Sequence, residues 1–284
     1  MNRIVIYDYS PELTSKLKGI EVIPRVHSLV DVTIAWEDAR QSNKVFCVWL
    51  DAPYMSLSDM DFASIQDGVS LVVYAYNLGD TFNVISQIDA IRRLNIRVFL
   101  SSTNEENFGS LKLLSSLGVD CGLQLDAKSI DDDVFLDLAS YSLLGQVPHA
   151  SIEPFDYIWR NIRQERGLDF NTTNFYNPQK YIYINENLDY SFSNEGLKEE
   201  VFIGNLEIDK VVAFEQEVLV KQNDYYRHFI ELDQCSKCSS FKICNRKCQS
   251  LFRNCNDVMA ILYEYAEIRD KNEHQFEHKN LCQL

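Results

Sequence analysis

The sequence predicts an α/β protein that begins with a partial (β/α) barrel or open parallel sheet and ends with a small cysteine-rich domain. Apolar runs of strand length alternate with amphipathic runs of helix length up to about residue 147, which indicates βα units. These units are too few for a closed eight-unit barrel, which takes about 250 residues. Prolines interrupt the alternation between 148 and 180, and five of the eight cysteines follow between 235 and 255.

Five segments of the first half are predicted to be strands. Each is almost wholly apolar, as expected for strands that are buried on both faces of a parallel sheet. They are 3–7 (RIVIY), 44–50 (KVFCVWL), 70–76 (SLVVYAY), 96–102 (IRVFLSS) and 120–127 (DCGLQLDA).

Three helices are predicted between and after the later strands. Segment 81–95 has apolar residues mostly at i, i+3 spacing, with Thr81 as the expected N-cap. Segment 107–118 has leucines on one face and stops at Gly118. Segment 131–145 begins with three aspartates, which the helix dipole favours, and stops at Gly145.

The second half of the sequence does not continue the alternation of strands and helices. A linker over 151–178 is expected to contain a short helix near 156–166, and segment 180–193 has the pattern of a hairpin that turns around Asn187. A helix-like segment and the cysteine-rich stretch follow, and a helix over 257–279 ends the pattern. The expected organisation is therefore a domain over 1–150, a linker over 151–178 and a cysteine-rich domain over 179–284.

The charge of the chain excludes some partners. A net charge of −15 would repel nucleic-acid phosphates and anionic membrane surfaces, so neither is expected to bind. No apolar run is long enough to span a membrane, and the first residues lack the apolar core of a signal peptide. We therefore expect a cytoplasmic protein, in which clustered cysteines bind metal more often than they form disulfides.

The cysteine-rich stretch has the spacing C-x2-C-x5-C-x3-C-x6-C. Four thiolates can bind Zn²⁺ or a [4Fe–4S] cluster, and the spacing does not distinguish between the two. The stretch contains five lysines and arginines and no acid, which favours thiolates and offsets an anionic centre. The predicted ligands of one Cys₄ metal centre are drawn from Cys235, Cys238, Cys244, Cys248 and Cys255.

The cysteine pattern resembles the SPASM domain that follows the barrel of radical S-adenosylmethionine (SAM) peptide maturases and sulfatase maturases. The hairpin over 180–193 and the Gly204, Asn205 and Leu206 segment are similar to the elements that precede the family's cysteines. The βα units of 1–150 resemble the family's partial barrel. The resemblance implies a partial radical-SAM-like barrel followed by a small SPASM-like metal-binding domain with a hairpin and a C-terminal helix.

The chain departs from this family at the residues that carry its chemistry. It contains no C-x3-C-x2-C triad and no Gly-Gly pair, so binding and cleavage of SAM are not expected. Phe192 stands where the hairpin of the family has a cysteine, so the resemblance implies one metal centre of the usual two. Cys235, Cys238 and Cys244 would hold it, with either Cys255 or Cys248 as the fourth ligand.

The resemblance then implies a non-catalytic accessory protein of ribosomal peptide maturation. Its partner would be a precursor peptide, a peptide-modifying enzyme, or both. Two alternatives stay open: an iron–sulfur electron-transfer or catalytic component of a maturase complex, and a zinc-stabilised scaffold outside peptide maturation.

Four further patterns could indicate metal binding or catalysis, but each has a simpler structural explanation. His274, His278 and Cys282 have metal-ligand spacing but lie at the end of a terminal helix, and the acids at 131–133 suit a helix start without Mg²⁺. His149 and Glu153 would make an acid–base pair but fall near the linker. Cys47, inside an apolar run, is expected to be a buried apolar residue.

Overall fold

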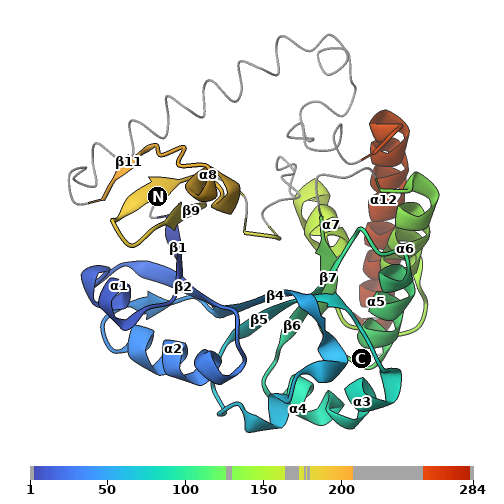
Figure 1. The fold of residues 1–284 in the computed structure, drawn as a ribbon. Helices are drawn as coiled ribbons and strands as arrows, with labels where there is room; N and C mark the ends of the chain where they lie inside the picture. Colours follow the sequence, from blue (N-terminus) through green and yellow to red (C-terminus); the bar gives the residue numbers. More distant parts are fainter. Residues whose placement is uncertain are drawn as a thin grey trace.

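The computed structural model describes residues 3–125, 130–163, 173–175, 177, 180–206 and 252–281, and in the last helix it describes side chains as far as Asn272 (Figure 1). The described residues form one large, mostly parallel sheet covered by helices, which confirms the α/β class. Among the described helices, none combines the length and the apolarity needed to cross a membrane.

The parallel strands lie side by side in the order in which they occur along the chain. The order is β1, β2, β4, β5, β6, β7 and β8, and β3 adds a short second pairing to β2. Their bounds are β1 Ile4–Asp8, β2 Glu21–Val26, β3 Lys44–Val45, β4 Val48–Ser56, β5 Leu71–Asn77, β6 Arg97–Ser101, β7 Cys121–Gln124 and β8 Ile152–Glu153.

The predicted hairpin extends this same sheet. Strand β9 (Tyr181–Ile184) pairs in parallel with β1, and β10 (Asp189–Ser191) returns antiparallel to β9. The turn between them contains Asn187, as predicted, and the side-chain oxygen of Asn185 accepts hydrogen bonds from the amides of Asn187 and Asp189. Strand β11 (Gly204–Asn205) then pairs with β10, so the order of the sheet runs from β11 to β8.

Nine described helices surround the sheet. Their bounds are α1 Pro11–Lys16, α2 Val30–Arg40, α3 Thr81–Ser86, α4 Ile88–Arg93, α5 Glu106–Ser116, α6 Asp132–Leu144, α7 Phe155–Arg163, α8 Asn194–Lys198 and α12 Cys255–Leu281. Two 3₁₀ turns, η1 (Leu57–Asp59) and η2 (Phe62–Ser64), connect β4 to β5. The helices predicted over 107–118 and 131–145, the short helix near 156–166 and the C-terminal helix are confirmed as α5, α6, α7 and α12.

The helix predicted over 81–95 is divided in two. Gln87 has φ −101° and ψ 0° and ends α3, and its side-chain oxygen accepts the amide hydrogen of Phe62 in η2. The prediction of Thr81 as the N-cap was wrong by one residue: the carboxylate of Asp80 accepts the amide of Asn83, and Thr81 is the first helical residue.

Strands β2 and β8 were among those missed in the sequence. Strand β2 contains Pro24 and Arg25, which interrupt its apolar pattern, yet both residues are buried between β1 and β4. Strand β8 has only two residues and lies inside the predicted linker, beside β7.

The two faces of the sheet bury different kinds of side chain. Toward the helices the strands present mainly valine, leucine and isoleucine. The opposite face, which we call the inner face, is filled mainly by aromatic side chains. They are Trp49, Tyr74, Phe99, Phe175, Tyr181 and Tyr183. Helix α12 lies along α6 (Figure 1) and places Met259 and Leu262 in the main core, together with Phe252 just before it.

Candidate metal centre and the polar cluster at the strand ends

One of the five predicted metal ligands lies within the described residues. Cys255 is the first residue of α12 and is partly exposed. Cys235, Cys238, Cys244 and Cys248 lie outside the described residues, so the Cys₄ centre and the choice between Cys248 and Cys255 stay predictions.

The backbone that leads into Cys255 is fixed onto the start of α6. The two carboxylate oxygens of Asp132 accept hydrogen bonds from the amides of Arg253 (3.2 Å) and Asn254 (3.0 Å). The ring of Phe252 packs on that of Phe135 with a centroid distance of 4.7 Å. Cys255 is therefore held near the N-termini of two helices, whose positive dipole ends favour a negatively charged ligand such as a metal-bound thiolate.

The acidic run at 131–133 has a structural use. Asp131 caps α6 by accepting the amide hydrogens of Asp133 (3.0 Å) and Val134 (3.1 Å), while Asp132 holds the end of the cysteine stretch. Within the part of the chain that the structure describes, no three His, Cys, Asp or Glu side chains converge closely enough to hold a metal ion.

The other two described cysteines are not placed to act as ligands. Cys47 is buried, as predicted, and burial raises the pKa of its thiol to about 12. Cys121 is also buried on β7, and burial raises the pKa of its thiol as well. A thiol with a raised pKa stays protonated at neutral pH and is a poor ligand and nucleophile.

His149 and Glu153 have separate partners. The Nδ1 atom of His149 lies 2.8 Å from Ala150 O, and its ring stacks on that of Tyr141. Glu153 accepts the amide of Tyr157 at 3.0 Å and lies 4.0 Å from Arg97 Nη1, and burial raises the pKa of its carboxyl. The backbone of His274 and His278 lies on α12, while their side chains and Cys282 are outside the description.

A polar cluster that was not predicted from the sequence lies where β1 and β2 end, beside Asp51 of β4. Arg25 makes a two-pronged contact with Asp8, with Nε–Oδ1 and Nη2–Oδ2 distances of 2.5 and 2.8 Å. Its Nη2 also donates to Asn194 Oδ1 of α8 at 2.9 Å, and its Nη1 lies 3.8 Å from Asp51 Oδ2. His27 completes the cluster, with Nδ1 2.9 Å from Asp51 O and Nε2 3.5 Å from Asp8 Oδ1.

The electrostatics of the cluster are set by the buried Arg25 side chain. Burial alone would lower the pKa of Arg25, but its partners Asp8 and Asp51 raise it. Burial would raise the pKa of Asp8, but hydrogen bonding to Arg25 holds it below the usual value. For Asp51, burial prevails over the attraction of Arg25 and raises the pKa. The cluster joins three parallel strands through ion pairs and joins α8 through the hydrogen bond from Arg25 to Asn194.

Two signals for this cluster were present in the sequence. Asp8 and Asp51 directly follow the predicted strands 3–7 and 44–50, and the carboxyl ends of parallel strands meet at one edge of a sheet. The link between them was invisible because β2, which carries Arg25, had not been predicted.

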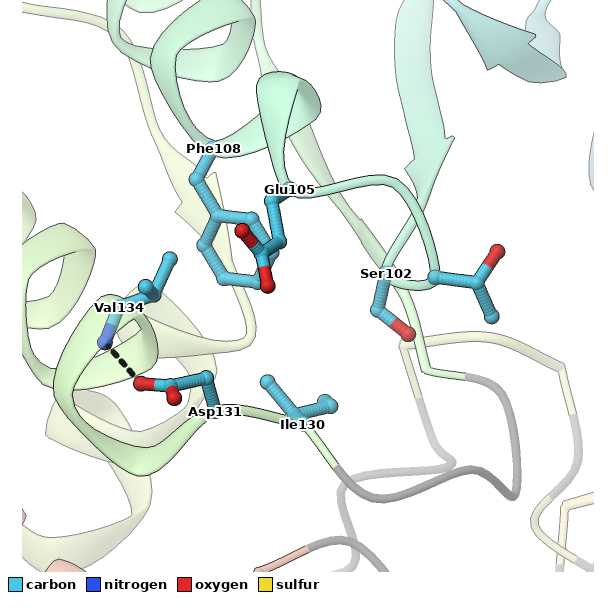
Figure 2. Close-up of a pocket in the computed structure, with 7 residues that line it drawn as sticks. Ser102, Glu105, Phe108, Ile130, Asp131 and Val134 are labelled. Carbon is cyan, nitrogen blue, oxygen red and sulfur yellow. Dashed lines mark hydrogen bonds between the residues drawn. The ribbon is translucent and has the colours of Figure 1, made fainter.

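A cavity of about 180 Å³ lies near the end of β6, beside the start of α6 (Figure 2). Its lining residues are Ser102, Thr103, Glu105, Phe108, Ile130, Asp131 and Val134. Figure 2 shows the carboxylate of Asp131 directed at the amide of Val134, so its charge is used in capping the helix. The cavity is smaller than typical small-molecule sites, which begin at about 300 Å³. A larger hollow of about 690 Å³ lies between the α6–β8 loop and Arg269 and Asn272 of α12.

Comparisons with known proteins name no family for this chain. No protein-family model matches it. A search of curated proteins also gave no match.

Proposed function

We propose that this chain is a non-catalytic, cytoplasmic accessory protein of ribosomal peptide maturation, built as a degenerate radical-SAM-like partial barrel with a SPASM-like metal domain. The observation that carries the proposal is the course of the sheet. Its parallel strands from β1 to β8 lie in chain order, as expected for a partial (β/α) barrel, and β9 adds to the β1 side and leads into the hairpin and the Gly204–Asn205 strand. This is the order of elements that the resemblance implies before the cysteine stretch.

The inner sheet face is closely packed with aromatic side chains, and the sequence lacks the residues for SAM chemistry. The Trp49 ring lies 5.0 Å from that of Tyr74 and 5.4 Å from that of Phe175, and Phe99 continues the cluster at 5.1 Å from Tyr74. These buried side chains form a packed core, as in the interior of a (β/α) barrel. The absence of the SAM-cluster cysteine triad from the sequence supports a non-catalytic role.

The metal centre would be structural. Cys235, Cys238 and Cys244, with Cys255 or Cys248, would bind one [4Fe–4S] cluster or Zn²⁺, and the free energy of metal binding would stabilise the fold around them. The precursor peptide or the peptide-modifying enzyme would be held by the protein surface rather than by the metal.

The test is metal analysis and visible absorption of anaerobically isolated protein, combined with titration of precursor peptides from the same gene neighbourhood. We expect one equivalent of zinc or one iron–sulfur cluster, and saturable binding of a precursor. Metal loading without binding of any precursor or modifying enzyme would favour the zinc-stabilised scaffold instead. A redox-active cluster that exchanges electrons with a maturase would favour the electron-transfer alternative.

A further inference from the structure

Strand β4 carries a bulge that pushes aromatic and apolar side chains into solvent. Ala52 pairs with Ala75 and Ser56 with Asn77, so three residues of β4 lie opposite the single residue Tyr76 of β5. Within the bulge Tyr54 is 96% exposed, and Met55 and Tyr76 are also exposed. Bulges at the ends of strands commonly redirect side chains toward a functional surface.

Helix α3 adds two more exposed apolar residues next to this bulge. Phe82 is 83% exposed and Ile85 is also exposed on α3, which follows β5. The amide of Ser58 in η1 donates to Leu78 O at 3.0 Å, which fixes the segment after the bulge beside the segment before α3. We call Tyr54, Met55, Tyr76, Phe82 and Ile85 the β4–β5 rim.

The exposed charged residues next to the rim are acidic. Residues 45–91 contain six aspartates and neither lysine nor arginine. Asp59 and Asp80 are exposed next to the rim, whereas Asp51, just before the bulge, is largely buried and lies 3.8 Å from Arg25. Several lysines and arginines lie instead in or near the segments that lead into β2, β3 and β6, at the amino ends of the strands. They are Lys16, Lys18, Arg40, Lys44, Arg92, Arg93 and Arg97.

We propose that the β4–β5 rim is a docking surface for an extended basic peptide segment with apolar side chains. Exposed aromatic residues make up a large share of binding hot spots, and their faces also attract lysine and arginine. The surrounding carboxylates complement a basic segment and steer its approach. This inference rests on the proposed function, since it locates the surface that would hold the precursor peptide.

A second copy of the chain suits the rim less well. A symmetric dimer through this patch would bring Asp59 and Asp80 of one copy close to the same carboxylates of the other. Like charges face to face oppose association, and each copy carries a net charge of −15. The acidic residues next to the rim therefore favour a cationic partner over self-association.

The test uses the full metal-loaded chain and a short fluorescein-labelled peptide of alternating lysine and leucine residues. Fluorescence anisotropy should show saturable binding that weakens as salt rises, and a peptide with glutamate in place of lysine should not bind. Tyr54→Ser combined with Phe82→Ser should weaken binding about tenfold. Asp59→Asn combined with Asp80→Ser should weaken it similarly, because serine preserves the cap of α3 while removing the charge.

Matched controls lie away from the rim. Val147→Ser removes an exposed apolar side chain, and Glu186→Gln removes an exposed charge in the hairpin turn, so both should leave peptide affinity unchanged. Circular dichroism should show that all variants fold. If wild-type protein instead sediments as a dimer that Tyr54→Ser dissociates, and the peptide does not bind, the rim is a self-association surface and the inference is wrong.

The rim and the proposed function can fail separately. Binding of precursor peptides with an affinity that the rim variants leave unchanged overturns the rim and leaves the proposed function intact. A metal-loaded protein that binds neither the probe nor any precursor overturns both the rim and the peptide-binding role.

Discussion

At the scale of single residues, the buried Arg25 side chain connects two aspartates and an asparagine from three other elements. Its side chain is 5% exposed, whereas that of its main partner Asp8 is 61% exposed. Asp8 therefore remains partly hydrated if the pair is broken, while Arg25 needs both Asp8 and Asn194 to replace its lost hydration. The planar fork of a guanidinium can make these contacts together, and a lysine ammonium cannot.

We predict that Arg25→Lys lowers the free energy of unfolding by about 1–3 kcal/mol. This is less than the roughly 3–5 kcal/mol for a fully buried pair, because Asp8 can be rehydrated. Urea denaturation measures the effect. Arg40→Lys is the matched control, since Arg40 pairs with Glu37 on the surface of α2 and should change stability by less than about 0.5 kcal/mol. Equal stabilities for the two variants would mean that the Arg25 fork contributes nothing.

Glu153 gives a prediction about pH. Burial raises the pKa of its carboxyl in the folded chain, so ionisation costs more when folded than when unfolded. The folded state therefore loses stability as pH rises from the ordinary glutamate value, about 4.3, through the raised folded value. Glutamine can still accept the amide of Tyr157 without the charge. Glu153→Gln should match the wild type below pH 4 and be more stable by roughly 1 kcal/mol at pH 8.

Chemical denaturation at both pH values measures this difference. Glu186→Gln, in the exposed hairpin turn, should differ from the wild type by less than about 0.5 kcal/mol at either pH. A Glu153→Gln variant that is less stable at pH 8 would show instead that the attraction between Glu153 and Arg97 outweighs its burial.

At the scale of elements, the close packing of β6, β7 and β8 requires a residue without a side chain at Gly122. A Cβ at Gly122 would lie 2.8 Å from both Phe99 Cε1 and Glu153 O. Phe99 fills the inner face, and Glu153 O belongs to the backbone of β8, so neither can move freely. Gly122→Ala should therefore destabilise the protein by about 1–3 kcal/mol through overpacking.

Gly109 provides the opposite case for the same substitution. It lies inside α5, and a Cβ there would meet nothing within 4 Å. Gly109→Ala should stabilise the protein by about 0.5–1 kcal/mol, because alanine favours helix and loses less backbone entropy than glycine. Thermal unfolding of the two variants measures both effects. A Gly122→Ala variant as stable as the wild type would contradict the tight packing of β7 against β8.

Helices α6 and α12 meet at Asp132, which gives a prediction about the metal centre. Asp132→Ala removes the acceptor for the amides of Arg253 and Asn254 and should loosen the position of Cys255. If Cys255 is a ligand, metal affinity should fall about tenfold or more, as it does when supporting residues around metal ligands are lost. Asp133→Ala, also in the first turn, is the control. Equal affinities in competition with a chelator would favour Cys248 as the fourth ligand.

The elements show how far the sequence alone could predict the fold. Strands β1, β4, β5, β6 and β7 were predictable because both of their faces are buried, which leaves continuous apolar runs. Strand β2 was not predictable, because Pro24 and Arg25 interrupt its apolar run. Both residues are buried only because β1 and β4 lie on either side of them. The break at Gln87 depends on the amide of Phe62, which lies far away in sequence. The polar cluster could not be assembled without β2, although Asp8 and Asp51 were visible.

At the scale of the whole molecule, the two ends of residues 179–284 are packed into the rest of the structure. Strand β9 pairs with β1 from Ile4↔Tyr181 to Tyr7↔Ile184, and Tyr181 and Tyr183 belong to the aromatic inner face. At the other end, Phe252, Met259 and Leu262 lie in the main core with α6 and α7. Cys235, Cys238, Cys244 and Cys248 therefore lie between two parts of the chain that are each packed into the core of the sheet and its helices.

This arrangement predicts what removal of the metal will do. Chelation of zinc, or oxidative loss of an iron–sulfur cluster, should leave hydrogen-exchange protection of β9 and α12 nearly unchanged, because their apolar contacts do not involve the metal. The cysteine-stretch thiols should become reactive toward a thiol reagent, while Cys47 and Cys121 stay unreactive because they are buried with raised pKa values. Loss of protection in β9 after metal removal would show that the metal centre supports the sheet itself.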